Sequence, residues 1–511
     1  MATRVTISRR NFLATLGSAW GAALLGRRAW AEASPGKWEL RARLAADPLR
    51  PQYHLLPAAG WMNDPCGPIY AGGLYHMFFQ YNPKGAYWGD MHWAHATSPD
   101  MIHWRHQRIA LAPNEGGYDQ AGVFSGCAVL DRGTPTIIYT GVAPPARPAD
   151  VTLRDQAHAW QEVQCMAASA DDLQSWQKAP APVIEHPPQG LSVTGFRDPC
   201  VWREGGQWMM GLGSGVRGRG GMVLLYQSPD LRRWSYLHPL AEGEWQGKAA
   251  ANPVDSGEMW ECPDFFPLGD RHVLLISTEG KVFWHVGRYE QRRFRSERTG
   301  MVDCGAYYAA RSMVDREGNR ILWGWIPERR PEKEYRAAGW AGVMSLPRKL
   351  SLAADGSLQI SPAPALSRLG IRRLGIATGT PRGRNGAKAH IPDPAAEIRL
   401  EINSRRDFRM RLVSSDGAEF AEVEYRPERR GKELRLNHAL AALDPADDKT
   451  TLRMFVDGSV LEVFAGSNTA ITDRVYAVPV LPLALEWEEA SAVEKVECWQ
   501  IEPISPDRLT S

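Results

Sequence analysis

A chain of 511 residues is too long for one hydrophobic core of ordinary size, so two domains are expected. Its 60 lysine and arginine residues almost balance its 58 aspartate and glutamate residues, and the basic residues form no block, which excludes the charge pattern of a nucleic-acid-binding protein. The composition favours a neutral small molecule as the partner.

The first 31 residues have the features of an export signal. Ser8-Arg9-Arg10-Asn11-Phe12-Leu13 places paired arginines ahead of a short apolar run, and a small-x-small site follows at Ala29-Trp30-Ala31. The run is too short, and too rich in glycine and alanine, to span a membrane. We expect a twin-arginine signal peptide over 1–31 and a tail over 32–49. The twin-arginine export machinery would deliver the protein to the periplasm or the exterior, with no membrane insertion after processing.

A short pattern occurs three times in the next part of the chain. It reads Ser98-Pro-Asp100-Met-Ile-His-Trp104, then Ser169-Ala-Asp171-Asp-Leu-Gln-Ser-Trp176, then Ser228-Pro-Asp230-Leu-Arg-Arg-Trp234. Each copy follows a strand-like apolar run, at 92–96, 164–168 and 222–226. This repetition is typical of four-stranded sheets arranged around an axis, and it predicts a β-propeller over 50–365. In such a fold, polar residues far apart in sequence converge on one funnel.

Beyond the proline- and alanine-rich segment 360–364 the pattern changes. Apolar residues alternate with charged ones over 398–402 and 408–412, which is typical of half-buried strands. Residues 452–463 predict a hairpin on the two-residue turn Asp457-Gly458. We therefore expect a β-sandwich over 366–511, with a structural role, and an all-β chain.

Three carboxylates stand beside aromatic residues or proline. Asp64 lies in Trp61-Met-Asn-Asp-Pro-Cys-Gly67, Asp198 in Gly195-Phe-Arg-Asp-Pro199, and Glu261 in Met259-Trp-Glu-Cys-Pro-Asp-Phe-Phe266. Burial of an ionised group in such a setting is costly without a partner. Asp-Pro also occurs in plain turns, but three such acids, each at the start of a propeller sheet, favour a catalytic site.

Glycoside hydrolysis requires this kind of set. One carboxylate attacks the anomeric carbon, a carboxylic acid protonates the leaving oxygen, and a third carboxylate can orient neighbouring sugar hydroxyls as positive charge develops on the ring. Arg197, adjacent to Asp198, would keep that carboxylate ionised. Glu261 lies between Trp260 and Cys262, where desolvation would raise its pKa, as a general acid requires.

The same segments carry a resemblance to a known family. Trp61 to Gly67, Phe79-Gln-Tyr-Asn-Pro83, Trp88-Gly-Asp-Met-His-Trp93, Phe124-Ser-Gly126, Phe196-Arg-Asp-Pro199 and Trp260-Glu-Cys262 resemble glycoside hydrolase family 32, the invertases, levanases and inulinases. Further matches follow in order at Asp303-Cys-Gly-Ala-Tyr-Tyr308, Trp323-Gly-Trp325, Gly339-Trp-Ala-Gly342 and Pro347-Arg348. Residues 82–85 and 259–267 are especially similar to the plant cell-wall type.

This resemblance implies a five-bladed propeller followed by a β-sandwich. It implies a retaining enzyme that releases terminal fructose from sucrose or short fructans and needs no metal or organic cofactor. In it, Asp64 is the nucleophile, Glu261 the acid/base and Asp198 the transition-state stabiliser. The residues that match the fructose site are Asn63, Gln80, Trp88, Phe124, Ser125 and Arg197, with Trp61 as a wall.

Three positions depart from the family pattern. Cys66 and Asp90 stand where the family usually has asparagine, and Cys127 stands where it usually has serine. In plant relatives, replacement of the first asparagine accompanies more fructosyl transfer, so a fructosyltransferase remains an alternative. A levanase or inulinase that prefers longer fructans is another. An arabinanase is disfavoured by Trp61-Met-Asn-Asp-Pro65, and a fructan-binding module without catalysis is disfavoured because no carboxylate is missing.

Other sequence patterns are weaker evidence of a functional site. Gly213-Ser-Gly215-Val-Arg-Gly218 fits a nucleotide-binding pattern, but a strand follows it where a nucleotide site needs a helix, and a hairpin explains it. His92 and His95 point to opposite faces of a strand, which disfavours a metal site. Seven scattered cysteines include no C-x-x-C pair. A protein exported by the twin-arginine route folds in the reducing cytoplasm, so no disulfide is required.

Overall fold

The computed structural model describes residues 35–154, 159–377, 388–427, 432–443, 449–488 and 492–505. The predicted signal peptide lies outside the described residues. The expected tail contains helix α2 (Pro35–Ala46). In the part of the chain that the structure describes, no helix combines the length and the apolar character needed to cross a membrane.

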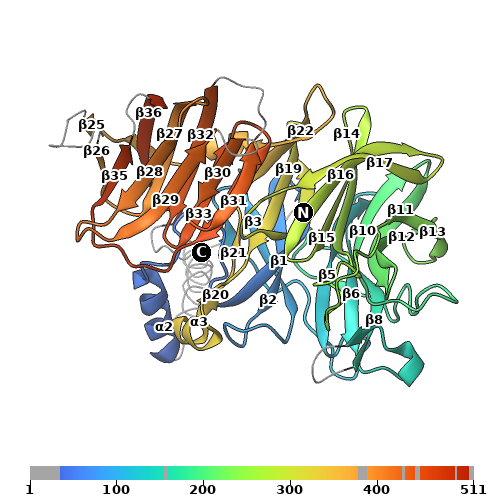
Figure 1. The fold of residues 1–511 in the computed structure, drawn as a ribbon. Coiled ribbons are helices and arrows are strands. Elements are labelled where there is room, and N and C mark those ends of the chain that lie inside the picture. The colour runs from blue at the N-terminus through green and yellow to red at the C-terminus, as the bar shows by residue number, and fades with distance from the viewer. Residues whose placement is uncertain are drawn as a thin grey trace, which may run out of the picture. The chain divides into compact units, whose positions relative to one another are not determined.

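The described residues between 60 and 362 form five sheets (Figure 1). The first holds β1 (Gly60–Ala71), β2 (Leu74–Asn82), β3 (His92–Ser98), β4 (Arg105–His106) and β20 (Trp340–Ala341). The second holds β5 (Gly122–Asp131), β6 (Thr134–Ala143), β7 (Leu153–Arg154), β8 (Ala159–Ala168) and β9 (Gln177–Lys178). The third holds β10 (Phe196–Glu204), β11 (Gln207–Val216), β12 (Gly220–Ser228) and β13 (Ser235–Glu242).

The fourth sheet holds β14 (Glu261–Leu268), β15 (Arg271–Thr278), β16 (Lys281–Glu290) and β17 (Arg293–Met301). The fifth holds β18 (Tyr308–Val314), β19 (Arg320–Ile326), β21 (Val343–Met344), β22 (Arg348–Leu352) and β23 (Leu358–Pro362). Three short helices lie outside the sheets, η1 (Pro148–Asp150), α3 (Glu332–Ala338) and η2 (Pro364–Arg368).

The first strands of the five sheets close a ring. β1 contacts β5, β5 contacts β10, β10 contacts β14, β14 contacts β18, and β18 contacts β1 again. This radial repetition of separate sheets is typical of a propeller, in which only short, protected sheet edges remain. The predicted β-propeller is confirmed, and the family's five blades agree in number with these five sheets.

The repeated sequence pattern forms the same turn in three sheets, between the third and the fourth main strand. The Asp100 carboxylate accepts hydrogen bonds from the backbone N–H groups of Ile102 and His103, and Asp230 does the same for the two residues at 232 and 233. The apolar residue of each turn is buried with a positive φ, at Met101, Leu173 and Leu231. The pattern therefore encodes a turn whose aspartate satisfies the backbone and whose apolar residue anchors it.

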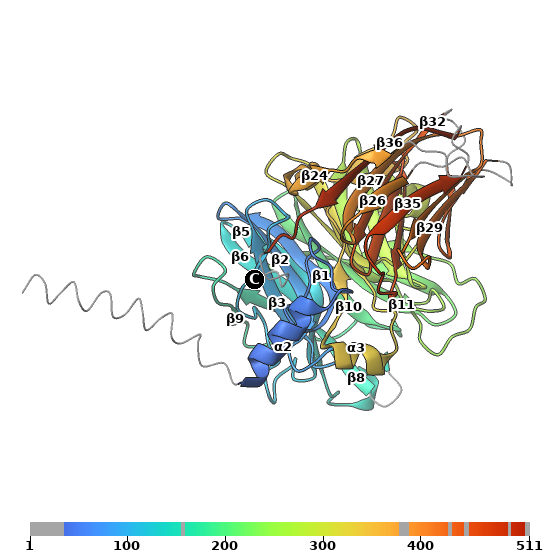
Figure 2. The same ribbon diagram turned by 90° about the vertical axis from the view of Figure 1, so that its left-hand side faces the viewer.

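The strands after η2 form a β-sandwich of two sheets (Figure 2). One sheet has the order β24 (Ile371–Arg373), β36 (Val493–Ile501), β27 (Ala395–Asn403), β32 (Lys449–Asp457), β33 (Val460–Ala465) and β34 (Thr469–Arg474). The other has the order β25 (Ile376–Ala377), β26 (Lys388–Ile391), β35 (Leu483–Glu488), β28 (Phe408–Val413), β29 (Glu419–Arg426), β30 (Lys432–Leu436) and β31 (Ala439–Leu443).

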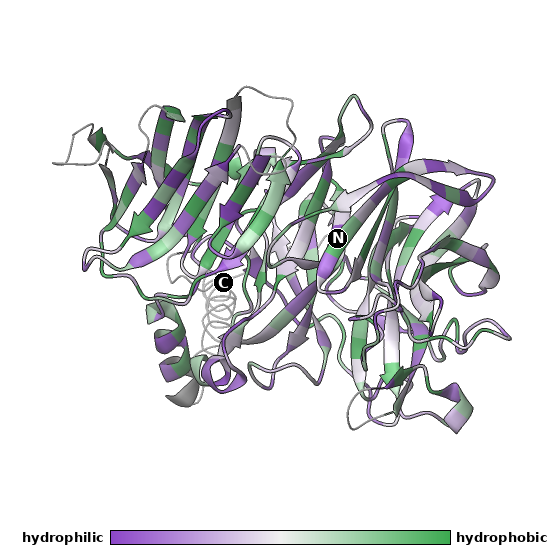
Figure 3. Cartoon of the chain, in the orientation of Figure 1, coloured by the Kyte–Doolittle hydropathy of each residue, from purple (hydrophilic) through white to green (hydrophobic). Residues whose placement is uncertain are grey.

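Figure 3 shows hydrophobic and hydrophilic residues alternating along several of these sandwich strands. In β28, Phe408, Met410 and Leu412 are buried, whereas Arg409 and Arg411 between them are half-buried. The period of two places one face of each sheet against the other and leaves the second face polar. The predicted strands and the Asp457-Gly458 hairpin between β32 and β33 are confirmed.

The turn at Asp457 also fixes the segment that leads into β1. Its buried carboxylate accepts hydrogen bonds from the backbone N–H groups of Gln52, Tyr53 and His54, at 2.6–3.0 Å. The His54 ring lies between Asp457 (2.7 Å) and Glu462 (3.0 Å). Burial opposes a charge on His54, but these two carboxylates raise its pKa to about 9. The charged ring therefore ties the sandwich to the chain just before the first inner strand.

Candidate active site

Each of the five inner strands has a β-bulge in its first six residues. The register shifts fall between Met62 and Pro65 in β1, Phe124 and Gly126 in β5, Arg197 and Cys200 in β10, Glu261 and Asp264 in β14, and Tyr308 and Arg311 in β18. Inside three of these bulges, Asp198, Cys262 and Ala309 have positive φ values of 66°, 49° and 53°. Bulges re-aim side chains. Here each one contains or borders a polar residue that reaches one shared pocket.

The pocket has a volume of about 180 Å³ and collects side chains from all five sheets. It is lined by Asn63, Asp64, Gln80, Trp88, Met91, Phe124, Ser125, Arg197, Asp198, Glu261, Tyr308 and Trp325. Nine of the ten predicted site residues are in this set. The tenth, Trp61, is not. Its indole N–H donates to Asn63 Oδ1 at 2.8 Å, and its ring packs against Trp325 at 5.9 Å between centroids. Trp61 thus supports the residues that form the wall.

Asp64 is held by three donors. Its Oδ2 accepts a hydrogen bond from the Ser125 hydroxyl at 2.7 Å and lies 3.5 Å from the Cys262 thiol, and its Oδ1 accepts from the Asn63 amide at 3.0 Å. Burial raises the pKa of Asp64 above its usual value, and the hydrogen bonds from Ser125 and Asn63 oppose this shift. The donors favour the ionised form, which is the form that a nucleophile needs.

Asp198 is more buried than Asp64, and its backbone N–H donates to Thr140 Oγ1 at 3.0 Å. Its Oδ2 accepts from the Cys262 backbone N–H, also at 3.0 Å. Burial raises the pKa of Asp198 to about 7, the positive charge of Arg197 opposes the rise, and the carboxylates of Glu261 and Asp64 add to it. The predicted effect of the Arg197 charge on Asp198 is therefore present in direction, but burial outweighs it, and the ion pairs of Arg197 are with two other acids.

Those acids are Glu261 and Glu162. Arg197 Nε and Nη2 donate to Glu261 Oε1 at 3.1 and 2.8 Å, and Nη1 donates to Glu162 Oε1 at 2.9 Å. The other Glu261 oxygen accepts from the Tyr308 hydroxyl at 2.7 Å. The apolar setting that we expected for Glu261 is therefore wrong, because its carboxyl group contacts a guanidinium and a phenol.

Met91, Tyr308 and Trp325 line the pocket but were not predicted as site residues. Tyr308 and Trp325 belong to segments that resemble the family, Asp303 to Tyr308 and Trp323 to Trp325, so the signal was present without a role attached to it. Glu162 had no such signal. It lies in β8, in a run of residues that is typical of an ordinary buried strand.

The three departures from the family pattern lie outside the pocket. Cys66 is fully buried, with its thiol 3.5 Å from the backbone oxygen of Asp64, and burial raises its pKa to about 12. It therefore offers no surface to an acceptor sugar. Asp90 pairs with Lys84 at 2.7 Å, which compensates its charge. Cys127 lines a separate cavity of about 280 Å³, together with Arg311 and Asp264.

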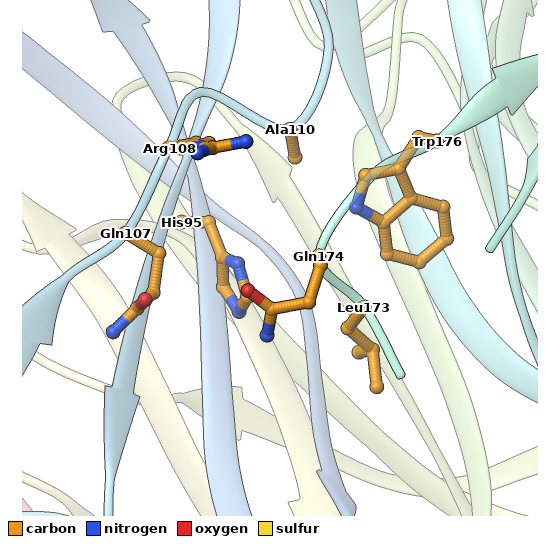
Figure 4. A pocket seen from close by; sticks show the side chains of 7 residues that line it. All are labelled: His95, Gln107, Arg108, Ala110, Leu173, Gln174 and Trp176. Carbon is orange, nitrogen blue, oxygen red and sulfur yellow. The ribbon is translucent and has the colours of Figure 1, made fainter. Parts of the chain in front are cut away.

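Other features that could resemble binding sites do not form one. A hollow that includes His95, Gln107 and Trp176 (Figure 4) has a volume of about 10 Å³, which is room for about one water molecule. His95 uses a ring nitrogen to bond His76 at 2.9 Å. No cluster of histidine, cysteine and acidic side chains suited to a metal ion occurs among the described residues, which include all seven cysteines, each of them free. Gly213 to Gly218 covers the end of β11 and the start of the turn into β12, as the predicted hairpin requires.

Comparison with known proteins decides the family. Residues 54–362 match the model of the glycosyl hydrolases family 32 N-terminal domain, and residues 376–500 match the model of the C-terminal domain of the same family. The chain belongs to glycosyl hydrolase family 32. It is therefore a glycoside hydrolase, as the resemblance implied.

Relatives of this family 32 chain include a sucrose-6-phosphate hydrolase of Escherichia coli, 35% identical over 462 residues, which are 84% of this chain and 90% of the relative. The cell-wall isozyme of β-fructofuranosidase from Zea mays is 36% identical over 361 residues, or 64% of this chain and 56% of the relative. A variant of a Bombyx mori family 32 β-fructofuranosidase, solved in complex with sucrose, superposes with a TM-score of 0.76 at 26% identity. That match covers 93% of this chain and 100% of the other.

The Ser125 hydroxyl favours ionised Asp64, so its removal has a predictable direction. In Ser125→Ala the loss of one hydrogen bond to a charged group, worth about 1.5 kcal/mol, moves the acid limb of the kcat/KM profile up by about one pH unit. The pH–rate profile measures this shift. Ser214→Ala is the matched control, because Ser214 is equally buried but donates to the Gly195 carbonyl. An acid limb that stays in place in Ser125→Ala contradicts the role given to this hydroxyl.

Proposed function

We propose that the chain is an exo-acting, retaining β-fructofuranosidase that releases terminal fructosyl units from sucrose and short fructans. The observation that carries the proposal is the convergence of Asp64, Asp198 and Glu261 in one pocket. There the Asp64 carboxylate is held by hydrogen-bond donors and the Glu261 carboxyl group is held by Arg197 and Tyr308.

In the first step, Asp64 Oδ attacks the anomeric carbon of the bound fructosyl unit. Glu261 gives its proton to the glycosidic oxygen, so the glucose or the rest of the fructan leaves as an alcohol. Positive charge develops on the ring as the bond breaks. Asp198 faces this charge and binds the neighbouring hydroxyl groups, which strengthens its contacts in the transition state.

In the second step, Glu261 is a carboxylate and takes a proton from water. The water oxygen attacks the same anomeric carbon and displaces Asp64, which returns to its ionised form. Two displacements at one carbon restore the β configuration. The proposed chemistry uses only these side chains and water, with no cofactor.

The size and the lining of the pocket support exo action. Its volume is below the roughly 300–1,000 Å³ that is usual for drug-sized ligands, so it suits one small polar unit. Trp88, 53% exposed, stands at the rim, where its ring can stack on the sugar that follows the fructose. A terminal unit fits such a site, whereas an internal unit of a fructan would need a groove with two open ends.

The charges of the pocket favour an unphosphorylated fructosyl unit. Among the residues that line it, all within the described part of the chain, Arg197 is the single cation, and both its carboxylate partners are already in place. A phosphate group on the fructosyl unit would meet three carboxylates with no free counter-charge. We therefore expect a substrate whose terminal fructosyl unit is unphosphorylated.

Product analysis tests this proposal. At early times, free fructose should be the product released from inulin and from levan, and sucrose should be cleaved with a higher kcat/KM than a sucrose phosphate that carries its phosphate on the fructosyl unit. Chromatography of timed samples measures both, with Asp64→Asn as the inactive control. A ladder of internal oligosaccharides from inulin, or a preference for the phosphorylated sugar, contradicts the substrate and the mode of action proposed here.

We also propose export of the protein by the twin-arginine route, on the sequence of residues 8–31 alone. Arg9→Lys combined with Arg10→Lys should leave active enzyme in the cytoplasm, as measured by activity in cell fractions. The chain offers a matched control in Arg27→Lys with Arg28→Lys, a second arginine pair that follows the apolar run. Equal export of both double variants would show that the first pair is no signal.

A further inference from the structure

Arg197 is shared between two acids, one inside the pocket and one behind it. Glu261 lines the pocket, whereas the Glu162 side chain has no exposed surface. Glu162 Oε1 accepts from Arg197 Nη1 at 2.9 Å, and Oε2 accepts from the Phe196 backbone N–H at 2.7 Å. The Glu162 backbone N–H donates to Thr152 Oγ1 at 2.9 Å. Glu162 is thereby locked in place, and it fixes the guanidinium that contacts the acid/base.

The inference rests on the proposed function, in which Glu261 is the general acid. The contact between Glu261 and Arg197 raises an electrostatic problem for that role. A general acid must hold a proton before the glycosidic bond breaks. A guanidinium at 2.8 Å favours the ionised form of a carboxyl group instead, typically by 1–3 pH units. An acid/base in direct contact with an arginine would lose its proton too easily, unless another charge offsets the arginine.

Glu162 supplies that charge. Burial alone would lower the pKa of Arg197, but the carboxylates of Glu162, Glu261 and Asp198, in that order, raise it well above the usual value. Arg197 therefore stays charged, and its charge is divided between Glu162 and Glu261. Because the ionised Glu162 and Arg197 together are neutral, Glu261 can carry a proton while it keeps its hydrogen bonds to the guanidinium.

We propose that Glu162 is a positioning residue that neutralises Arg197 and so keeps Glu261 protonated until the leaving group departs. Other groups also face Glu261: Tyr308 from β18, Asp64 from β1, Asp198 from β10 and the Cys262 thiol from its own strand. The carboxyl groups of Asp64 and Asp198 also interact electrostatically with Glu261. They take part in the reaction itself, however, whereas Glu162 keeps its place throughout the cycle.

The test is the basic limb of the pH–rate profile for kcat/KM on sucrose. Glu162→Gln keeps the shape and removes the charge, so Arg197 acts on Glu261 alone. The basic limb should move to lower pH by on the order of half a unit to one unit, less than a charge in direct contact would cause. Glu162→Asp retains the charge beside Arg197 and should leave the limb at the wild-type pH, whatever its effect on kcat.

A second substrate separates loss of the acid from damage to the nucleophile. Fluoride leaves β-fructofuranosyl fluoride without the need for a proton, so Glu162→Gln should lose activity on sucrose above the shifted limb and keep most of its rate on the fluoride. Thermal unfolding shows whether the variant is folded. If it is not folded, Glu162→Met removes the charge without placing an amide donor against Arg197. This variant should show the same shift of the basic limb to lower pH.

The outcomes distinguish this inference from the proposed function. If Glu261→Ala keeps the basic limb on sucrose, the acid/base assignment itself is wrong. If Glu261→Ala loses the limb, but folded Glu162→Gln or Glu162→Met has it at the wild-type pH, only the role of Glu162 is overturned. Equal losses on sucrose and on the fluoride would indicate a purely structural role for Glu162, which also overturns the proposal.

Discussion

Repulsion among the carboxyl groups of Asp64, Asp198 and Glu261 is the interaction that the surroundings of the pocket must offset. Charges of one sign in a buried space favour protonation, and burial raises the pKa of both aspartates. The fold offsets this repulsion with hydrogen-bond donors that point at each carboxyl group. Ser125 and Asn63 hold Asp64, a backbone N–H holds Asp198, and Arg197 with Tyr308 holds Glu261. Each acid thus has its own set of donors, and the three can take different roles.

The geometry of the ring makes these separate environments possible. In a regular strand, neighbouring side chains alternate between faces, so two polar residues in sequence cannot both reach the funnel. The bulges at the start of the inner strands break this rule and turn single residues such as Asp198 toward the axis. The ring also needs its first strand in place. Asp457 of the sandwich binds the backbone of residues 52–54, just before β1, which gives the second domain a structural part in the site.

Local patterns in the sequence were enough for the strands and turns. Alternation over 398–402 and 408–412 and the Asp457-Gly458 turn each depend on residues close in sequence, and each occurs in the structure as predicted. The three Ser-x-Asp segments were predicted only as a repeat, and the structure shows that the repeated unit is a turn. The family motifs also named most of the residues that line the pocket. Pairing across sheets could not be predicted in this way. Arg197 has Asp198 as its sequence neighbour, yet it pairs with acids 35 and 64 positions away, on β8 and β14. Trp61 was predicted as a wall of the fructose site for a similar reason. Nothing in the sequence around Trp61 shows that Trp325 packs against it and lines the pocket instead.

The central claim of this account is that Asp64 forms a covalent bond to the fructosyl unit, and trapping that intermediate tests it most directly. Glu261→Ala lacks the base for the second step, while β-fructofuranosyl fluoride needs no acid for the first, so the ester should accumulate. Mass spectrometry of the intact protein should show the added mass of one fructosyl unit, and a digest at low pH should place it on the peptide that contains Asp64. Fluoride release without a bound fructosyl unit, or a label on Asp198 in place of Asp64, would contradict the mechanism.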